Sequence, residues 1–254
     1  MRQDLRRFSE TLARLPARQG RLESCLRRAF MTSCRVVGWS VRIELVGPLP
    51  VAGGRPGAGC IVVAAPHRAW LEPFLLLAAW PPGAARLVWL ADARTITRSW
   101  WRRLLLPRVG VLPVTPGSGS PRRYVEAAAA ATRAGHAVAV FPEVGPPSPP
   151  ERVRRISPGF AYLAVASGAP VVPVVIGGTH RIVRGSSFSV GIGRALGTGA
   201  AMDDPFVPAG RERAAVLTEG LTGVLEHDLP ARNAWADERA PERERWPWLA
   251  TLFG

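Results

Sequence analysis

The chain has 254 residues, of which 47% are hydrophobic, and it carries a formal net charge of +14. This length is enough for one sizeable α/β domain with a full core, and nothing in the sequence requires a second domain. No run of 18 or more apolar residues occurs, which argues against a membrane-spanning helix. The arginine-rich N-terminus also lacks the pattern of a secretory signal, so we expect a cytoplasmic protein.

The positive charge comes from arginine alone, because the 33 basic residues include no lysine. An excess of this size is typical of proteins that bind nucleic acid or an anionic membrane surface. No nucleic-acid-reading motif accompanies the charge, and we expect no nucleic-acid partner. A lysine-free composition rich in Ala, Gly, Pro and Arg also fits a GC-rich genome, so part of the charge reflects codon usage.

The three cysteines, Cys25, Cys34 and Cys60, show no C-x-x-C spacing and cannot all pair. This argues against a disulfide framework and against a zinc site, and we expect no metal. Cys60 lies in an apolar run and is most simply a small core residue.

The first 46 residues are predicted to form an N-terminal amphipathic helical region, because residues such as Phe8 and Phe30 alternate with arginines. Such helices suit a membrane surface, and they equally suit packing on a core, since both need the same helical period. Residues 42–47 then alternate like a half-buried strand, and a loop rich in Pro and Gly follows.

Residues 47–230 are predicted to form a single α/β domain. Two helices are expected, from Pro121 to Gly135 and from Pro158 to Gly168, because each has a Ser-Pro start and a glycine end. Apolar runs predict strands at residues 60–65, 86–91, 111–115, 137–141, 171–176 and 188–192. This alternation predicts a mostly parallel central sheet flanked by helices, with the active site at the carboxyl ends of the strands.

Two segments rich in tryptophan fall outside this alternation. Residues 97–108 combine adjacent tryptophans, leucines and arginines. That mixture suits the headgroup boundary of a membrane, or else a buried helix whose arginines reach solvent. Residues 231–254 form a Trp-containing C-terminal tail, which is either a second membrane contact or a disordered end.

A histidine and a glutamate lie five residues apart where the first strand of this domain ends and an apolar helix begins. His67 and Glu72 could therefore act as a base and its orienting carboxylate. Alone, such a pair is weak evidence, but three further blocks follow in order: Phe141-Pro142-Glu143-Val144-Gly145, Ser157-Pro158-Gly159-Phe160 and Val172-Pro173-Val174.

Together the four blocks resemble the glycerolipid acyltransferase family, which includes the lysophospholipid and 1-acylglycerol-3-phosphate acyltransferases. In that family a His-x4-Asp motif supplies the base. The resemblance implies that His67 deprotonates an acceptor hydroxyl, while Glu72, a Glu variant of the motif's Asp, orients the imidazole. It also implies that Glu143 and Gly145 bind the acceptor. The implied reaction moves a fatty acyl group from acyl-CoA or acyl carrier protein to a lysophospholipid-like acceptor, in phospholipid biosynthesis or remodelling.

The sequence departs from the family where two arginines would hold the acceptor phosphate. Pro116 and the run 146–150 occupy those places. Other arginines could replace them through bidentate contacts, or could simply be solvated surface charges. These candidates are Arg122, Arg123, Arg152, Arg154 and Arg155.

Two hypotheses follow. The first is an active O-acyltransferase, peripheral on the inner face of the cell membrane, whose partners are an acyl thioester donor, a lysolipid acceptor and the anionic membrane surface. It would need no cofactor beyond the co-substrate. The sequence has no Gly-x-Ser-x-Gly elbow, which favours direct transfer over an acyl-enzyme. The second is a weakened or inactive lipid-binding relative, as Glu72 and the missing arginines would suggest.

Overall fold

The computed structural model describes residues 20–49, 59–92, 110–114 and 121–240. Its main sheet has seven strands: β1 (Ser40–Leu45), β2 (Cys60–Ala65), β3 (Leu87–Asp92), β4 (Val111–Val114), β5 (Ala137–Val140), β8 (Val171–Gly177) and β9 (Ser187–Ile192). Their order across the sheet is β1-β9-β8-β2-β5-β3-β4. The five strands from β8 to β4 are mutually parallel, whereas β9 is antiparallel to β8, and β1 is parallel to β9. The predicted fold class is confirmed.

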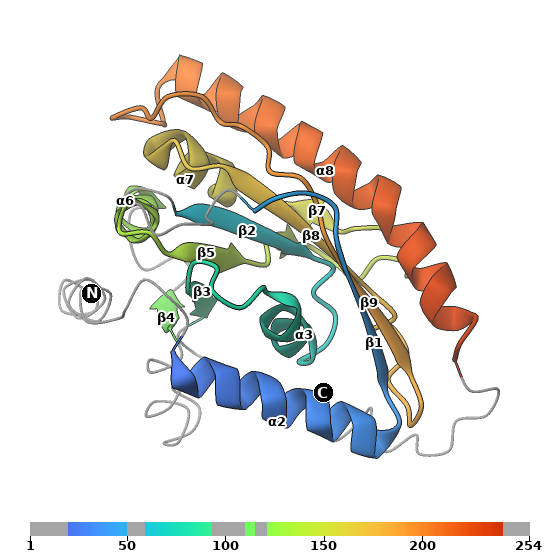
Figure 1. Cartoon of the computed structure of the whole chain (residues 1–254). Coiled ribbons are helices and arrows are strands. Elements are labelled where there is room, and N and C mark those ends of the chain that lie inside the picture. The colour runs from blue at the N-terminus through green and yellow to red at the C-terminus, as the bar shows by residue number, and fades with distance from the viewer. Residues whose placement is uncertain (1–19, 50–58, 93–109, 115–120, 241–254) are drawn as a thin grey trace.

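Helices cover both faces of this sheet (Figure 1). They are α2 (Arg21–Val37), α3 (Glu72–Ala79), α6 (Pro121–Arg133), α7 (Gly159–Ser167) and α8 (Pro208–Asp237). One face packs against α6, α7 and α8, and the other packs against α3, with α2 lying outside α3. The sheet is therefore buried on both sides, as parallel sheets usually are.

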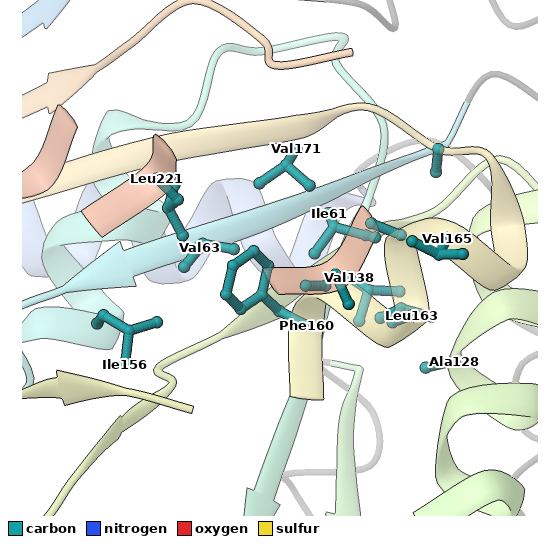
Figure 2. Close-up of a cluster of buried hydrophobic side chains, with 14 of the residues drawn as sticks. Ile61, Val63, Ala128, Val138, Ile156, Phe160, Leu163, Val165, Val171 and Leu221 are labelled. Carbon is teal, nitrogen blue, oxygen red and sulfur yellow. The ribbon is translucent and has the colours of Figure 1, made fainter. Parts of the chain in front are cut away.

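The core consists of two apolar clusters separated by the sheet. Alternate residues of β2 belong to opposite clusters, so Ile61 and Val63 face α7 while Cys60 and Val62 face α3. Figure 2 shows the first cluster, in which Phe160 of α7 packs among side chains from the sheet and from α8. A strand that is apolar at every position, as β2 is, can be stable only when both faces are covered.

The last helix runs beyond the predicted domain boundary. Leu221, Leu225 and Leu229 of α8 recur every four residues and are fully buried against the core. The helix continues through Pro230 to Asp237, so the predicted boundary at residue 230 falls inside it. Burial of Asn233 and other residues in the last turns holds this part of the helix against the domain.

The predicted N-terminal helical region contains α2 and ends in a strand, β1, that belongs to the main sheet. Several contacts hold α2 to the domain; among them, Phe30 stacks on Phe74 of α3, and the buried Glu23 pairs with the buried Arg86. Residues 1–19 and the two tryptophan-rich stretches at 97–108 and 241–254 lie outside the described residues. Within the described part of the chain, no helix is both long and apolar enough to cross a bilayer.

The different burial of the three cysteines predicts how fast each thiol reacts. Cys25 is exposed, whereas Cys34 and Cys60 are buried. Burial raises the pKa of the Cys34 thiol and raises the pKa of Cys60 to about 12, so neither forms a reactive thiolate near neutral pH. We expect Ellman's reagent to modify one thiol rapidly in the native protein and all three after unfolding. Cys25→Ser should remove the fast phase; a fast phase that survives would contradict this packing.

Candidate active site

His67 and Glu143 meet because they follow neighbouring strands. β2 pairs in parallel with β5, with Val63 opposite Val140. Each residue comes shortly after its strand ends, so both lie at the carboxyl edge of the sheet, where ligands bind in folds of this type. There the backbone N–H of His67 donates a 2.7 Å hydrogen bond to Oε2 of Glu143.

The carboxylate of Glu72 is completely buried, and backbone amides satisfy it. Oε1 accepts hydrogen bonds from the N–H of Arg68 at 3.0 Å and of Ala69 at 2.8 Å, and Oε2 also accepts from Ala69 at 2.8 Å. Glu72 is the first residue of α3, where the helix dipole favours a negative charge. These bonds hold the carboxylate beside the loop that carries His67.

The imidazole of His67 lies between this carboxylate and an aromatic ring. Its Nδ1 is 3.3 Å from Oε2 of Glu72, and the ring stacks on Phe141 with centroids 4.3 Å apart. The side chain remains 45% exposed, so a substrate can reach it. We assign the proton of the neutral ring to Nδ1, beside the carboxylate, which leaves Nε2 as the basic nitrogen. The structure thus brings the two side chains of the predicted pair together.

Glu143 contacts the protein backbone rather than the imidazole. While Oε2 binds the N–H of His67, Oε1 accepts a 2.9 Å hydrogen bond from the N–H of Arg154. The residue begins a two-stranded ladder, in which β6 (Glu143–Val144) pairs with β7 (Arg155–Ile156). Gly145 follows with a φ of +95°, a value that favours glycine, and allows the chain to turn away from the site.

The structure separates the five candidate arginines into three groups. Arg122 already pairs with Glu126 at 3.4 Å and with Asp204 at 3.0 Å. The side chain of Arg123 lies outside the described residues. Three candidates lie on the segment that returns to Glu143, and these are Arg152, Arg154 and Arg155. Among the described residues, the buried Nε of Arg154 has no hydrogen-bond partner.

Sequence reasoning missed Arg68, which fastens the loop between β6 and β7. Its guanidinium donates hydrogen bonds to the carbonyl oxygens of Ser148, Pro149 and Arg152, at 3.4, 2.8 and 2.5 Å respectively, and to the Ser148 hydroxyl at 3.3 Å. Burial lowers the pKa of Arg68, and the nearby charge of Glu143 opposes that effect. In the sequence, only its position next to His67 marked Arg68 as a candidate. Its partners are mostly main-chain carbonyl oxygens, which every residue has, so no side-chain pattern could reveal them.

A second set of hydrogen bonds, made by α8, holds the same loop. The buried Asn233 of α8 donates from Nδ2 to the carbonyl of Pro150 at 2.7 Å, and its Oδ1 accepts from the N–H of Gly178 at 2.9 Å. The loop that presents Arg154 to Glu143 is therefore fixed both to the His67 segment and to the last helix.

Loss of the Arg68 clamp should destabilise the protein. We expect Arg68→Gln to lower the free energy of unfolding by about 1–3 kcal/mol, since it removes charge-assisted hydrogen bonds from a half-buried guanidinium to three carbonyl oxygens of the loop. Arg155→Gln is the matched control: Arg155 is exposed on β7 and should change stability by less than about 0.5 kcal/mol. Urea denaturation measures both values. Equal effects of the two substitutions would contradict the clamp.

The comparisons with known proteins concern the fold and the family of the chain. The fold is similar to the crystal structure of PlsC, the 1-acyl-sn-glycerophosphate (LPA) acyltransferase from Thermotoga maritima. The TM-score is 0.54 at 19% sequence identity, over 82% of this chain and 79% of that one. At this identity the likeness shows the fold alone. The search of curated proteins finds no match. A family model described as Acyltransferase matches residues 48–177, more than half of the chain, and the protein therefore belongs to the Acyltransferase family.

Proposed function

We propose that the protein is an O-acyltransferase that moves a fatty acyl group from a thioester donor to the hydroxyl of a lysophospholipid-like acceptor. The observation that carries this proposal is the imidazole of His67, exposed on one side and held 3.3 Å from the buried carboxylate of Glu72 on the other. In a chain of the Acyltransferase family, such a pair is suited to activating a hydroxyl.

The chemistry needs one base and no covalent enzyme intermediate. Nε2 of His67 takes the hydroxyl proton as the acceptor oxygen attacks the thioester carbonyl. The tetrahedral intermediate then collapses, the carbon–sulfur bond breaks, and the departing thiolate takes the proton back from the imidazolium. Glu72 stabilises the imidazolium between these two events, while itself remaining ionised.

A glutamate can fill this role because of how its carboxylate is held. Its extra methylene, compared with aspartate, would ordinarily loosen the position of the charge. Here the hydrogen bonds from the backbone amides of Arg68 and Ala69 fix both oxygens, and one of those oxygens is the one nearest Nδ1. The Glu variant therefore supports an active enzyme.

The acceptor's phosphate would be held by the segment that follows Glu143 and Gly145. Arg154 is the strongest candidate, because its Nε is buried without a partner among the described residues and its backbone is fixed to Glu143. The exposed Arg152 and Arg155 can add their charges. Arg122 is a weaker candidate because Glu126 and Asp204 already neutralise its charge.

We further propose that the enzyme works at the inner face of the cell membrane, where its acceptor resides. Supporting this, the apolar side chains of Trp70 and Phe74 are 36% and 42% exposed, and both lie close to His67 in the chain. Either acyl-CoA or acyl carrier protein fits the reaction as donor. With a lysophospholipid as acceptor, the enzyme would act in phospholipid biosynthesis or remodelling.

A second candidate function is lipid binding without efficient catalysis. One specific observation favours it: both oxygens of Glu143, and Nη1 and Nη2 of Arg68, already form hydrogen bonds within the protein. If these groups do not rearrange, the site offers fewer contacts to an acceptor.

Substitution of the base distinguishes the two functions. Purified protein should convert radiolabelled acyl thioester and mixed lysolipids into a diacyl product identified by mass. We expect His67→Ala to lower kcat by about 10²–10⁴, the usual contribution of a positioned general base. Full activity in this variant would reject His67 as the base, and an inert wild-type protein would support the lipid-binding alternative.

Substitution of the orienting acid tests the geometry of the pair. Glu72→Gln keeps the length of the side chain but removes the charge that stabilises the imidazolium. We expect kcat to fall at least about tenfold, with KM for the acceptor nearly unchanged, because the lost interaction strengthens only in the transition state. Glu219→Gln, a change of the same kind at an exposed position of α8, serves as the control and should leave kcat unaltered.

A further inference from the structure

A hollow of about 490 Å³ lies between α2 and the turn that follows α3. Three arginines of α2 line it: Arg27, Arg28 and Arg35. Pro82 and Gly83 of the turn form part of the opposite wall. No acidic residue among those that the structure describes lines the hollow, and its size falls within the range of small-molecule sites.

The described residues do not balance the positive charge of this hollow. Arg28 and Arg35 are exposed and have no acidic partner among the described residues. Arg27 is half-buried, and within the described residues its guanidinium donates one hydrogen bond, to the carbonyl of Trp80 at 3.3 Å. The single acid of α2, Glu23, is buried against Arg86 and cannot neutralise the exposed face. A concave, uncompensated arginine cluster is suited to phosphate groups, which guanidinium binds bidentately.

The hollow lies one short helix away from the imidazole. α3 begins at Glu72, beside His67, and its eight residues rise about 12 Å before the Pro82–Gly83 turn. α2 packs against α3 through two contacts: Phe30 stacks on Phe74 near the start of α3, and Arg27 bonds to the carbonyl of Trp80 at its end. The length of α3 thus separates His67 from the arginine cluster.

We propose that this hollow binds the nucleotide phosphates of an acyl-CoA donor. The inference rests on the proposed function. In acyl-CoA the thioester and the phosphates occupy opposite ends of a flexible pantetheine arm, so a donor site needs an anion-binding part away from the base. A concave cluster fits a compact ligand with several phosphates better than it fits a bilayer, which presents its headgroups as a plane.

The test compares three arginines of the same helix. Arg28→Gln and Arg35→Gln remove charges that line the hollow. Arg21→Gln removes an equal charge from an exposed position of α2 outside it. Glutamine keeps nearly the same helix propensity, so all three variants should fold. Calorimetry then measures binding of coenzyme A, of 3′-dephospho-coenzyme A and of phosphatidylglycerol vesicles, and kinetics with acyl-CoA gives KM and kcat.

We expect each lining variant to weaken coenzyme A binding and to raise KM for acyl-CoA by about three- to tenfold, at unchanged kcat, since partly exposed charge pairs contribute modestly. Arg21→Gln should change neither value by more than about twofold. Dephospho-coenzyme A should be less sensitive to the substitutions. Equal weakening by all three variants would overturn the proposal. So would loss of vesicle binding alone, which would assign the arginines to the membrane, or a raised KM only for donors on acyl carrier protein.

Direct binding separates this proposal from the proposed function. If the wild-type protein binds coenzyme A with the expected dependence on Arg28 and Arg35 but transfers no acyl group, the site stands and the catalytic assignment fails. If acyl transfer depends on His67 and coenzyme A binding is insensitive to both lining variants, the catalytic assignment stands and the site fails.

Discussion

The pairing of β2 with β5 is the constraint on which the candidate site depends. These strands are adjacent and parallel at the centre of the sheet, so the loops that leave them emerge side by side. One loop carries His67 and the other carries Glu143, and a single carboxylate oxygen links them. Nearly complete burial of both strands holds this pairing, because neither can leave the core without exposing apolar surface on two faces.

The charges of the site are balanced largely by backbone groups. Amide N–H groups donate hydrogen bonds to the carboxylates of Glu72 and Glu143, and carbonyl oxygens accept hydrogen bonds from the guanidinium of Arg68. Fixed dipoles of this kind do not rearrange when a charge forms. An imidazolium at His67 would therefore arise in surroundings that are already oriented, with Glu72 as its nearest anion.

The sequence was sufficient to predict those secondary-structure elements whose residue pattern has a single physical explanation. The run Cys60–Ala65 is apolar at every position and bounded by turn residues, and the structure shows a strand with the same limits. The β6–β7 ladder was missed because it has only two residues in each strand and is joined by a proline-rich loop. The roles of Arg68 and Asn233 could not be predicted, since their partners are mostly main-chain atoms brought close by strand order, which no local pattern encodes.

The doubly clamped loop between β6 and β7 has a consequence for how the sequence can vary. Arg68 and Asn233 hold it through its carbonyl oxygens, and Glu143 holds the N–H of Arg154. Contacts to the main chain place little demand on most side chains of the loop but fix the number of residues between the anchors. We therefore expect most side chains of the loop, apart from Gly145, Arg152 and Arg154, to be exchangeable while its length is not, so that a single inserted or deleted residue would disturb His67 more than several substitutions would.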